Sequence, residues 1–573
     1  MAIARMSKML GFVSTLLVAV SAIRLDEIAR RGGYNEQTLK DWELRLRGLD
    51  HGNASSSKRY YNDQTKDYFV KSLPEIPQNF MTEMYSGLIP IDENDPSRAL
   101  FFVFQPRIGD PVDEITIWLN GGPGCSSLEG FFQENGYSEA VQRAKIVRNT
   151  LLIATSQLGM GAARSRDQPV RVADTVEHLV ASRSEEPSLS SANFYSVDAG
   201  LSNRIGKPNA TNEEDIAADF VKFFKNFETL FGIENYQIYV TGESYAGRYV
   251  PYISNAMLEE QDECYFNLSG ALMYDPCIGK FDYQNEVYTL PFLEQNNNIL
   301  GYNKSYLAHL AQADEACGYA EYRRDWMQFP PVEHQPPEYP DNSTAEECGL
   351  WESAYNEAYR VNPCFNVYEP NLQCPLLSDP LGFPTDLQFV SPGLPVYFNR
   401  TDVKKAMHAP LNVTWSECNG GVFLADDGNG GGPGSGGPEA YGDTSPDPIQ
   451  GVLPKVIAVT NRVLVANGDL DMEILTNATL LAIQNMTWNG KLGFQKRPSK
   501  PIVIDLPDLM YNATFVANGD EGMDEPQGTM GVQHYERGLM WAETYLSGHM
   551  QPQFQPRSTY RHLQWLLRRI DTL

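Results

Sequence analysis

The stretch VTGESYAGRYVPY, residues 240–252, constrains the fold of this chain more than any other part of the sequence. It places Ser244 between Gly242 and Ala246, after an apolar segment at 237–240 that predicts a strand and before a segment with helical character. A serine between small residues at such a junction is typical of a nucleophile elbow, a sharp turn that exposes the hydroxyl group at the end of a strand. The sequence therefore predicts a strand, an elbow and a helix in that order.

Segments before the elbow extend this alternation. Residues 115–119 predict a strand that runs into the glycine-rich loop NGGPGCSS. Thr211 and Glu214 then form a capping-box pattern before apolar residues at helical spacing, and Gly232 can end that helix. Alternating strands and helices favour an α/β fold with a central, mostly parallel sheet flanked by helices.

The rest of the chain divides by composition. A basic start, an apolar run too short to cross a bilayer and small residues at its end indicate a signal peptide at 1–22. The other predicted parts are a propeptide or N-terminal arm at 23–60, one large domain at 61–573, a disulfide-braced insertion at 253–400 and a mobile Gly/Pro-rich loop at 419–451. No later segment is apolar enough to be a transmembrane helix, and the charged C-terminus argues against a lipid-anchor signal.

Several features suit an exported protein. Ten Asn-x-Ser/Thr sequons predict N-linked glycans, at Asn53, Asn209, Asn267, Asn303, Asn342, Asn399, Asn412, Asn477, Asn485 and Asn512. Eight cysteines suit disulfides in an oxidising compartment, and their spacing shows no zinc-ligand pattern, so no metal or other cofactor is predicted. The net charge of −28 argues against nucleic acid and anionic membranes as partners. We expect secretion, with vacuolar delivery as the alternative.

An elbow serine needs a base that takes its proton and a third group that orients the base. Among the eight histidines, His549 in the loop LSGHMQPQFQP is the first choice for the base. His534 is the second choice, and its surroundings predict a helix. The turn NGDLD follows a predicted strand and offers Asp469 and Asp471 as the orienting acid. Serine, acid and histidine then follow the chain order of α/β-hydrolases.

Four ordered motifs carry a family resemblance. WLNGGPGCSS, GESYAGRYVPY, NGDLD and SGHMQPQFQP together resemble the serine carboxypeptidases of the α/β-hydrolase superfamily. CSSLEGFFQENG and MGVQHYERGLMWAETYLSGHMQPQ resemble secreted fungal enzymes of the carboxypeptidase S1 type most strongly. The resemblance implies hydrolysis of the C-terminal peptide bond of peptides and proteins at acidic pH, through an acyl-enzyme on Ser244.

The resemblance also implies roles for individual residues. The catalytic residues would be the nucleophile Ser244, the orienting acid Asp471 and the base His549, with Asp469 left a structural role. The oxyanion hole would be formed by the backbone N–H groups of Gly122 and Tyr245. The substrate's terminal carboxylate would be bound by Asn120, Gly121, Glu134 and Glu243. The leaving residue's pocket would include Glu129 and Met550, and a disulfide would join Cys125 to Cys418.

Glu243 poses a physical question, because a carboxylate beside the nucleophile should repel an anionic substrate end. Closely placed carboxyl groups share protons, since neighbouring like charges raise an apparent pKa. A protonated Glu243 or Glu134 would donate a hydrogen bond to the substrate carboxylate, whereas the ionised pair would repel it. We therefore expect peptide affinity to fall as the pH rises. The carboxylate of Glu129 would favour peptides that end in Lys or Arg, through charge pairing.

One segment departs from the family pattern. Residues 137–202 are rich in Arg and Ser, lack the expected Gln-Pro-x-Gly-x-Gly-Phe-Ser motif and contain no convincing strand pattern. True divergence and translated noncoding sequence from a faulty gene model fit this composition equally. We expect the sheet to lack a central strand here, which would leave unpaired backbone groups.

Two rival functions remain open at this stage. An acyltransferase on the same fold would pass the acyl group to an alcohol instead of water. A secreted, catalytically impaired binding protein would keep the motifs without the activity. The intact Ser, Asp and His set favours the hydrolase.

Overall fold

The computed structural model describes residues 58–76, 81–92, 94–107, 111–135, 193–203, 210–336, 348–372, 374, 396–418, 422–424, 442–504 and 528–573. Nearly all of these residues belong to one compact unit, 59–504 with 529–573. The other unit, 1–58 with 505–528, lies outside the described residues except for Lys58 and Gly528. The predicted signal peptide at 1–22 and almost all of the arm at 23–60 are therefore not described.

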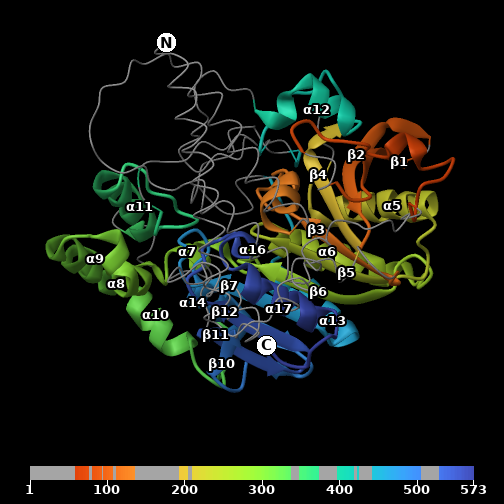
Figure 1. Ribbon diagram of the computed structural model, residues 1–573. Helices are drawn as coiled ribbons and strands as arrows, with labels where there is room; N and C mark the ends of the chain where they lie inside the picture. Colours follow the sequence, from red (N-terminus) through yellow and green to blue (C-terminus); the bar gives the residue numbers. More distant parts are fainter. Residues whose placement is uncertain are drawn as a thin grey trace, which may run out of the picture. The chain divides into compact units, whose positions relative to one another are not determined.

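The central element is a ten-stranded sheet formed by the described residues, in the order β1-β2-β4-β3-β5-β6-β7-β12-β11-β10 (Figure 1). Its strands are β1 (Tyr85–Asp92), β2 (Asp95–Gln105), β3 (Glu114–Leu119), β4 (Asn193–Asn203), β5 (Gln237–Glu243), β6 (Leu268–Tyr274), β7 (Val463–Gly468), β10 (Lys500–Ile504), β11 (Gly528–Glu536) and β12 (Leu539–Thr544). The run from β4 to β12 is parallel, whereas β1, β2 and β11 pair antiparallel. The predicted mostly parallel sheet is confirmed.

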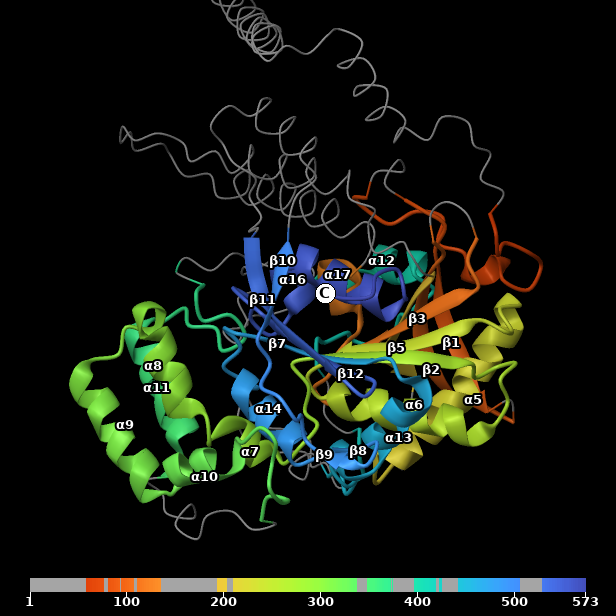
Figure 2. The same ribbon diagram turned by 90° about the horizontal axis from the view of Figure 1, so that it is seen from below.

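Helices cover both faces of this sheet (Figure 2). One face carries α5 (Glu213–Phe231), α6 (Ala246–Glu260) and α13 (Val452–Thr460), and the other carries α12 (Thr401–Ala406), α16 (Gln551–Phe554) and α17 (Pro556–Leu566). Every residue of β3 and β7 is buried, because each of these strands is covered on both sides. This double cover explains why parallel strands read as continuous apolar runs.

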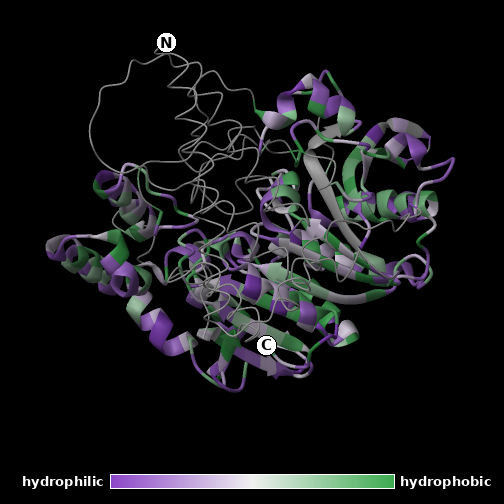
Figure 3. Cartoon of the chain, in the orientation of Figure 1, coloured by the Kyte–Doolittle hydropathy of each residue, from purple (hydrophilic) through white to green (hydrophobic). Residues whose placement is uncertain are grey.

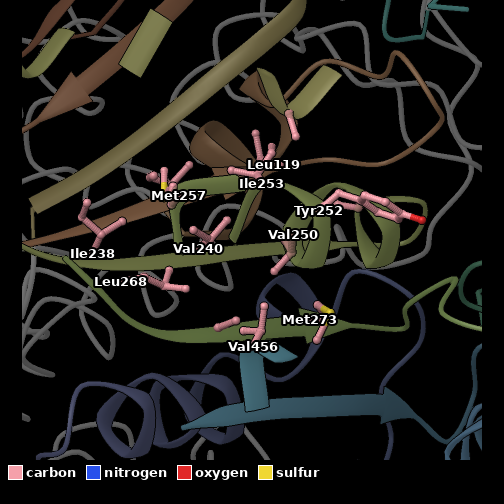
Figure 4. Packing of buried hydrophobic residues seen from close by; sticks show 14 of the residues in the cluster. Leu119, Ile238, Val240, Val250, Tyr252, Ile253, Met257, Leu268, Met273 and Val456 are labelled. Carbon is pink, nitrogen blue, oxygen red and sulfur yellow. The ribbon is translucent and has the colours of Figure 1, made fainter. Parts of the chain in front are cut away.

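The packing of α6 against β5 and β6 stabilises the elbow at which this helix begins. Val250, Ile253 and Met257 on α6 pack against Val240 of β5 and Met273 of β6 (Figure 4). All five side chains are at most 2% exposed. The helix that begins at the elbow is therefore fixed along its length by the apolar core.

The N-cap of helix α5 lies one residue after the predicted cap. Asn212, rather than Thr211, accepts a hydrogen bond from the Asp215 N–H at 2.9 Å, and Thr211 instead donates its N–H to the Asp215 side chain at 2.9 Å. An Asn with extended backbone is as good a cap as Thr, which is why the pattern alone misplaced it. Gly232 ends the helix with φ of +63°, as predicted.

A helical lobe occupies the inserted region between the elbow and the acid (Figures 1 and 2). It consists of α7 (Phe281–Asn285), α8 (Thr289–Leu300), α9 (Lys304–Ala316), α10 (Tyr319–Trp326) and α11 (Leu350–Val361). Its own apolar cluster packs against α14 (Thr476–Gln484), and α10 is mostly hydrophilic (Figure 3). The small hairpin β8 (Thr487–Trp488) and β9 (Lys491–Leu492) follows α14.

The insertion is shorter than the predicted 253–400. Residues 253–260 end α6 and β6 lies inside the central sheet, so the inserted lobe begins only after β6. Disulfides Cys317–Cys348 and Cys364–Cys374 brace it. The other two cysteines of that range, Cys264 and Cys277, are free thiols. The prediction placed β6 inside the insertion because Cys264 and Cys277, on either side of this strand, suggested disulfides of the inserted region.

Residues 193–203 form β4, which pairs antiparallel with β2 and parallel with β3. The expectation that 137–202 contains no strand is therefore wrong for its last ten residues. Backbone pairing between two strands decides this assignment, and it leaves little trace in a single segment's composition. The sheet is continuous at this position, and residues 136–192 lie outside the described part of the chain.

Three further expectations need correction. His534 lies in strand β11, not in a helix, because the two-residue turn at Arg537 and Gly538 has positive φ at both positions (+53° and +91°) and closes a hairpin with β12. Tyr60 packs in the core at 6% exposure, so the folded part begins before residue 61.

Residues 442–451 do not belong to a mobile loop as predicted, because Arg248 pairs with Asp447 at 2.7 Å. Residues 419–421 and 425–441 of that loop are not described.

Candidate active site

Ser244 occupies a strained turn between β5 and α6. Its φ is +61°, in the left-handed region, and its N–H donates to the Tyr274 carbonyl at 2.9 Å. A Cβ at Gly242 would lie 2.4 Å from the Leu119 carbonyl oxygen, so only glycine lets the elbow approach β3 this closely. Backbone contacts with both neighbouring strands therefore hold the turn, and the side chain of Ser244 is half-buried at its tip.

The glycine-rich loop after β3 packs directly on the elbow. A Cβ at Gly121 would come within 2.5 Å of the Tyr245 backbone nitrogen and 2.7 Å of the Ser244 Cβ. Gly122 has φ of +108°, which also favours glycine. A disulfide joins Cys125 to Cys418 across this loop, as the resemblance implies. The two expected oxyanion donors, the N–H groups of Gly122 and Tyr245, thus belong to backbone segments in contact.

The structure brings Asp471 and His549 together. His549 Nδ1 lies 2.7 Å from Asp471 Oδ2, and their side chains are 4% and 0% exposed. The other Asp471 oxygen accepts the Glu473 N–H at 2.8 Å. An Nδ1–H donor to Asp471 leaves Nε2 as the ring nitrogen that can take up a proton. This arrangement matches a base held by an orienting carboxylate.

Strand order brings the serine to the same edge. Ser244, Asp471 and His549 follow the carboxyl ends of β5, β7 and β12, which lie in one parallel run through β6. The carboxyl ends of parallel strands share one edge of a sheet, which is where α/β folds place their sites. These three residues, which are distant in sequence, therefore share one edge of the sheet.

Asp469 serves the turn rather than the imidazole. Its carboxyl group accepts the Ser547 N–H at 3.3 Å, and its own N–H donates to the Thr544 carbonyl at 3.0 Å. Burial raises the pKa of Asp469 to about 6. This aspartate links the turn after β7 to the loop after β12, which keeps Asp471 and His549 in register.

A second pair of acids lies beside the elbow. Glu243 and Glu134 are 3% and 2% exposed, and Glu134 ends the π-helical turn Gly130–Glu134. Asn120 Nδ2 donates to Glu243 Oε1 at 2.8 Å. Burial above all, and then the neighbouring charges of Glu134 and Glu129, raise the pKa of Glu243 well above its ordinary value. The pair therefore retains a proton at pH values where free glutamates are ionised.

Asn120 is oriented by two hydrogen bonds to its side-chain oxygen. Trp118 Nε1 donates at 2.7 Å and the Gly130 N–H donates at 3.2 Å. A Cβ at Gly130 would lie 1.8 Å from Trp118 Nε1, so the residue must be glycine. Since both donors bind the oxygen, the amide nitrogen of Asn120 is the atom directed at Glu243.

The two residues expected in the leaving-residue pocket lie next to these groups. Glu129 is half-buried and precedes the π-helical turn that holds Glu134. Its charge contributes to the raised pKa of Glu243. Met550 is half-buried and directly follows His549. By contrast, the second-choice base, His534, pairs with Glu536 at 2.7 Å on β11.

Sequence reasoning missed a carboxyl group behind the acid. Asp275 follows β6, is fully buried and accepts hydrogen bonds from the Gly468 N–H at 2.8 Å and from Gln551 Nε2 at 2.6 Å. Burial, followed by the charge of Asp471, raises the pKa of Asp275 well above its ordinary value. A signal existed, because an aspartate just after an apolar strand is the pattern that offered Asp469 and Asp471 as candidates for the acid.

The inserted lobe also contacts the histidine loop. The Tyr368 carbonyl accepts the His549 N–H at 2.8 Å, and the two rings lie 5.0 Å apart. Glu369 accepts the Gly548 N–H at 2.6 Å, and burial raises the pKa of Glu369 to about 8. The Cys364–Cys374 disulfide encloses this segment. Nothing in the local sequence signals this role, which depends on tertiary contact.

The side chain of Tyr245 is anchored in a buried network as well. Its hydroxyl oxygen lies within hydrogen-bond distance of a carboxyl oxygen of Asp443, at 2.8 Å, and of Glu213, at 3.1 Å. Arg248 pairs with Asp443 at 3.2 Å, with side chains 3% and 0% exposed. Residues on α5, α6 and the 442–447 segment thus fix the residue whose backbone N–H is the expected oxyanion donor.

The sequon asparagines differ in exposure. Exposed are Asn303, Asn412 and Asn477. Half-buried are Asn267, Asn399 and Asn485. Outside the described residues lie Asn53, Asn209, Asn342 and Asn512. In the described part of the chain, no helix is long and apolar enough to cross a membrane, and no group of three or more His, Cys, Asp or Glu side chains is arranged to hold a metal ion.

Comparison with known proteins places these features in context. Residues 74–151 and 195–569 match the family model described as serine carboxypeptidase. The chain is 52% identical over 574 residues to serine-type carboxypeptidase F of Aspergillus niger, covering 98% of this chain and 100% of the relative. It is 36% identical over 522 residues to a probable serine carboxypeptidase of Arthroderma benhamiae, covering 89% and 88% of the two chains.

A solved structure shares the fold. The crystal structure of a prohormone-processing carboxypeptidase from Saccharomyces cerevisiae aligns with a TM-score of 0.59 at 20% identity, covering 88% of this chain and 96% of that one. The family match leaves out residues 152–194, which lie within the segment that departs from the family pattern in sequence.

Proposed function

The chain belongs to the serine carboxypeptidase family, has the α/β-hydrolase fold and is a serine-type carboxypeptidase, and from that premise we propose that Ser244, His549 and Asp471 perform its reaction. The observation that carries this assignment is the buried contact of 2.7 Å between His549 Nδ1 and Asp471 at the sheet edge that holds the strained Ser244. The substrates are peptide and protein C-termini, and the working pH is acidic.

The reaction proceeds in two halves. His549 Nε2 takes the proton of the Ser244 hydroxyl group while its oxygen attacks the last peptide carbonyl. Asp471 stabilises the imidazolium that forms, and the N–H groups of Gly122 and Tyr245 bind the oxyanion. His549 then gives its proton to the departing amine, which releases the C-terminal residue. Water, activated by the same histidine, hydrolyses the acyl-enzyme. Each oxyanion donor contributes about 100- to 1000-fold in rate.

Exopeptidase specificity comes from the acid pair beside the elbow. In the protonated form, Glu134 or Glu243 donates a hydrogen bond to the substrate's terminal carboxylate, together with Asn120 and the Gly121 backbone. Burial supports this role because it raises the pKa of Glu243 and keeps the pair protonated under acidic conditions. As the pH rises through that raised pKa, the pair becomes charged and repels the substrate, so KM for peptides increases.

Preference for the leaving residue follows from its surroundings. Glu129 favours a C-terminal Lys or Arg by charge pairing, and Met550 supplies apolar surface. The ratio of kcat/KM for peptides ending in Lys and in Leu measures this preference. Glu129→Gln should lower the ratio, and an unchanged ratio would remove Glu129 from the pocket.

Location and processing follow from the N-terminus. The disulfides fit the secretory pathway. Cleavage after a signal peptide at 1–22, glycosylation at the sequons and secretion, rather than vacuolar delivery, complete the proposal. N-terminal sequencing and glycosidase treatment of the protein from culture medium test these points, and retention of all of the protein inside cells would favour the vacuole.

A labelling experiment tests the assignment of the nucleophile. An organophosphate should modify the peptide that contains Ser244 in stoichiometric amount, and Ser244→Ala should abolish both labelling and hydrolysis of a blocked dipeptide. Faster transfer of an acyl group from a sugar ester to an alcohol than to water would favour the acyltransferase. Absence of labelling in a folded protein would favour the impaired binding protein.

A further inference from the structure

Asp275 lies at the centre of the catalytic sheet edge, between the strand that carries the nucleophile and the strand that carries the acid. It follows β6, and its N–H donates to the Ala466 carbonyl on β7 at 2.7 Å. Its side chain is fully buried, and Gly468 connects it to Asp471, because the Gly468 N–H donates to Asp275 at 2.8 Å and the Gly468 carbonyl accepts the Asp471 N–H at 3.3 Å. A second carboxyl group, that of Asp275, is therefore linked to Asp471, the acid that orients the base.

The hydrogen bonds of Asp275 connect the segment after β6 with the segments after β7 and β12. One oxygen accepts the Gly468 N–H at 2.8 Å, from the turn that leads to Asp471. The other accepts Gln551 Nε2 at 2.6 Å, two residues after His549. Gln551 is itself fixed, because Thr544 donates to its side-chain oxygen at 2.7 Å. Asp275 is thus oriented from β7 and from the segment that carries the base.

Two carboxyl groups buried close together are not both ionised, because like charges repel strongly where water is excluded. Both carboxyl groups accept two hydrogen bonds, but the donors to Asp275 are neutral amides, whereas Asp471 faces His549, whose ring becomes positively charged in the proposed reaction. A negative charge on Asp471 is the arrangement that stabilises this cation. The proton therefore belongs to Asp275. Burial, and next the charge of Asp471, raise the pKa of Asp275 well above its ordinary value.

We propose that Asp275 is a positioning residue for the hydrolytic reaction, which keeps its proton, donates it in a hydrogen bond to Asp471 and so leaves Asp471 as the single negative charge facing His549. The inference rests on the roles proposed for Asp471 and His549. It goes beyond them because it adds a neutral acid that sets how strongly Asp471 attracts the imidazolium. Among the described residues, Glu243 from β5 and Tyr274 from β6 are further titratable groups that interact with Asp275.

The sign of a pKa change distinguishes a neutral Asp275 from a charged one. The acid limb of the kcat/KM profile reports protonation of His549 in the free enzyme. Asp275→Asn replaces a neutral acid with a neutral amide, so the limb should stay within about 0.3 pH units and kcat within about tenfold. Asp275→Ala removes the donor, strengthens the attraction of Asp471 for the imidazolium and should move the limb to higher pH by about half a unit or more.

The experiment uses an N-blocked amino acid ester, because a substrate without a terminal carboxylate does not report on Glu134 and Glu243. Glu228→Gln, which removes a buried carboxyl group from α5, is the control and should leave the limb in place. A shift of the limb to lower pH by about one unit in Asp275→Asn would overturn the proposal, since it would mean that a negative charge was removed.

An unchanged limb in both Asp275 variants, with only the melting temperature lowered, would also overturn it, because that is the result expected of a purely structural residue. Organophosphate labelling keeps the two proposals apart. Labelling of Ser244 in the parent enzyme tests the nucleophile, whereas the position of the limb tests Asp275 alone. Asp275→Asn keeps a donor toward Asp471 and the native size, which guards against the loss of folding that the Ala variant risks.

Discussion

Two pairs of buried acids flank the nucleophile, and they use the same physical effect for different ends. Glu134 and Glu243 lie on the side of the glycine loop, while Asp275 and Asp471 lie on the side of the histidine. All four side chains are at most 3% exposed. In each pair, burial and the neighbouring carboxyl group raise the pKa of one member, Glu243 or Asp275.

The difference lies in what completes each pair. The aspartates are surrounded by protein donors, namely Gly468, Gln551, Glu473 and His549. Among the described residues, Glu243 accepts the amide hydrogen bond of Asn120, and the charge of Glu134 raises its pKa. On our account, the substrate carboxylate is a further partner of this pair. A closed pair holds one charge in place for catalysis, and an open pair recognises an anion through its proton.

The largest effect should follow from breaking the closed pair. Asp471→Asn removes the charge that stabilises the imidazolium and favours the wrong histidine tautomer, so kcat should fall by about 10⁴-fold. Peptide KM should change little, because the open pair is untouched. Steady-state kinetics of a blocked dipeptide measure both constants. A large rise in KM without a fall in kcat would show that the two pairs do not divide their work in this way.

A smaller effect should follow from altering the open pair. Gln at position 243 keeps a hydrogen-bond donor but cannot ionise. The rise in peptide KM between pH 4.5 and pH 8 should therefore be about tenfold smaller in Glu243→Gln than in the parent enzyme. Hydrolysis of an N-blocked ester, which lacks the terminal carboxylate, serves as the control and should change by less than about threefold. If the ester and the peptide lost activity equally, Glu243 would support the elbow and not the substrate.

The smallest effect concerns an acid that belongs to neither pair. Glu228 on α5 is fully buried, and neither of its oxygens has a hydrogen-bond partner among the described residues. Burial, followed by the charges of Glu234 and Asp262, raises its pKa to about 9. The pKa of Glu228 is higher in the folded state than in the unfolded state. Its ionisation therefore opposes folding, and the free energy of unfolding falls as the pH rises from about 4.5 toward 9.

Glu228→Gln should therefore stabilise the fold more at pH 8 than at pH 4. The gain grows by at most about 1.4 kcal/mol per pH unit within that window. Melting temperatures of the parent and the variant at the two pH values test this. An equal difference at both would show that Glu228 is already ionised, and such a result would weaken the argument from burial for the two functional pairs.

The fold and the main site residues were predictable from sequence because their signals are local. A serine between Gly242 and Ala246 after a strand marks the elbow, and a turn with two aspartates after another strand offers the acid. Asp275 carries the same local signal, but its importance depends on the pairing of β6 with β7, which composition does not reveal. Tyr368 and Glu369 belong to the inserted lobe, and only tertiary contact brings them to the histidine loop.

Local signals also misled in two places. The segment around His534 has helical spacing but forms a hairpin strand, because the turn after it pairs β11 with β12. The segment that ends in β4 has no strand pattern by composition, yet its backbone completes the sheet between β2 and β3. In both cases, pairing between strands outweighed the preference of the single segment. A transcript across residues 137–202 would show whether that sequence is expressed as written.

The most direct test of the central claim compares one peptide in two forms. KM is measured from pH 4 to 8 for a blocked dipeptide with a free C-terminus and for the same dipeptide as its C-terminal amide. We expect KM of the free acid to rise as Glu134 and Glu243 lose their shared proton, while KM of the amide changes far less. A free-acid KM that stays constant over this range, or that follows the amide, would contradict recognition of the chain end by a protonated acid pair.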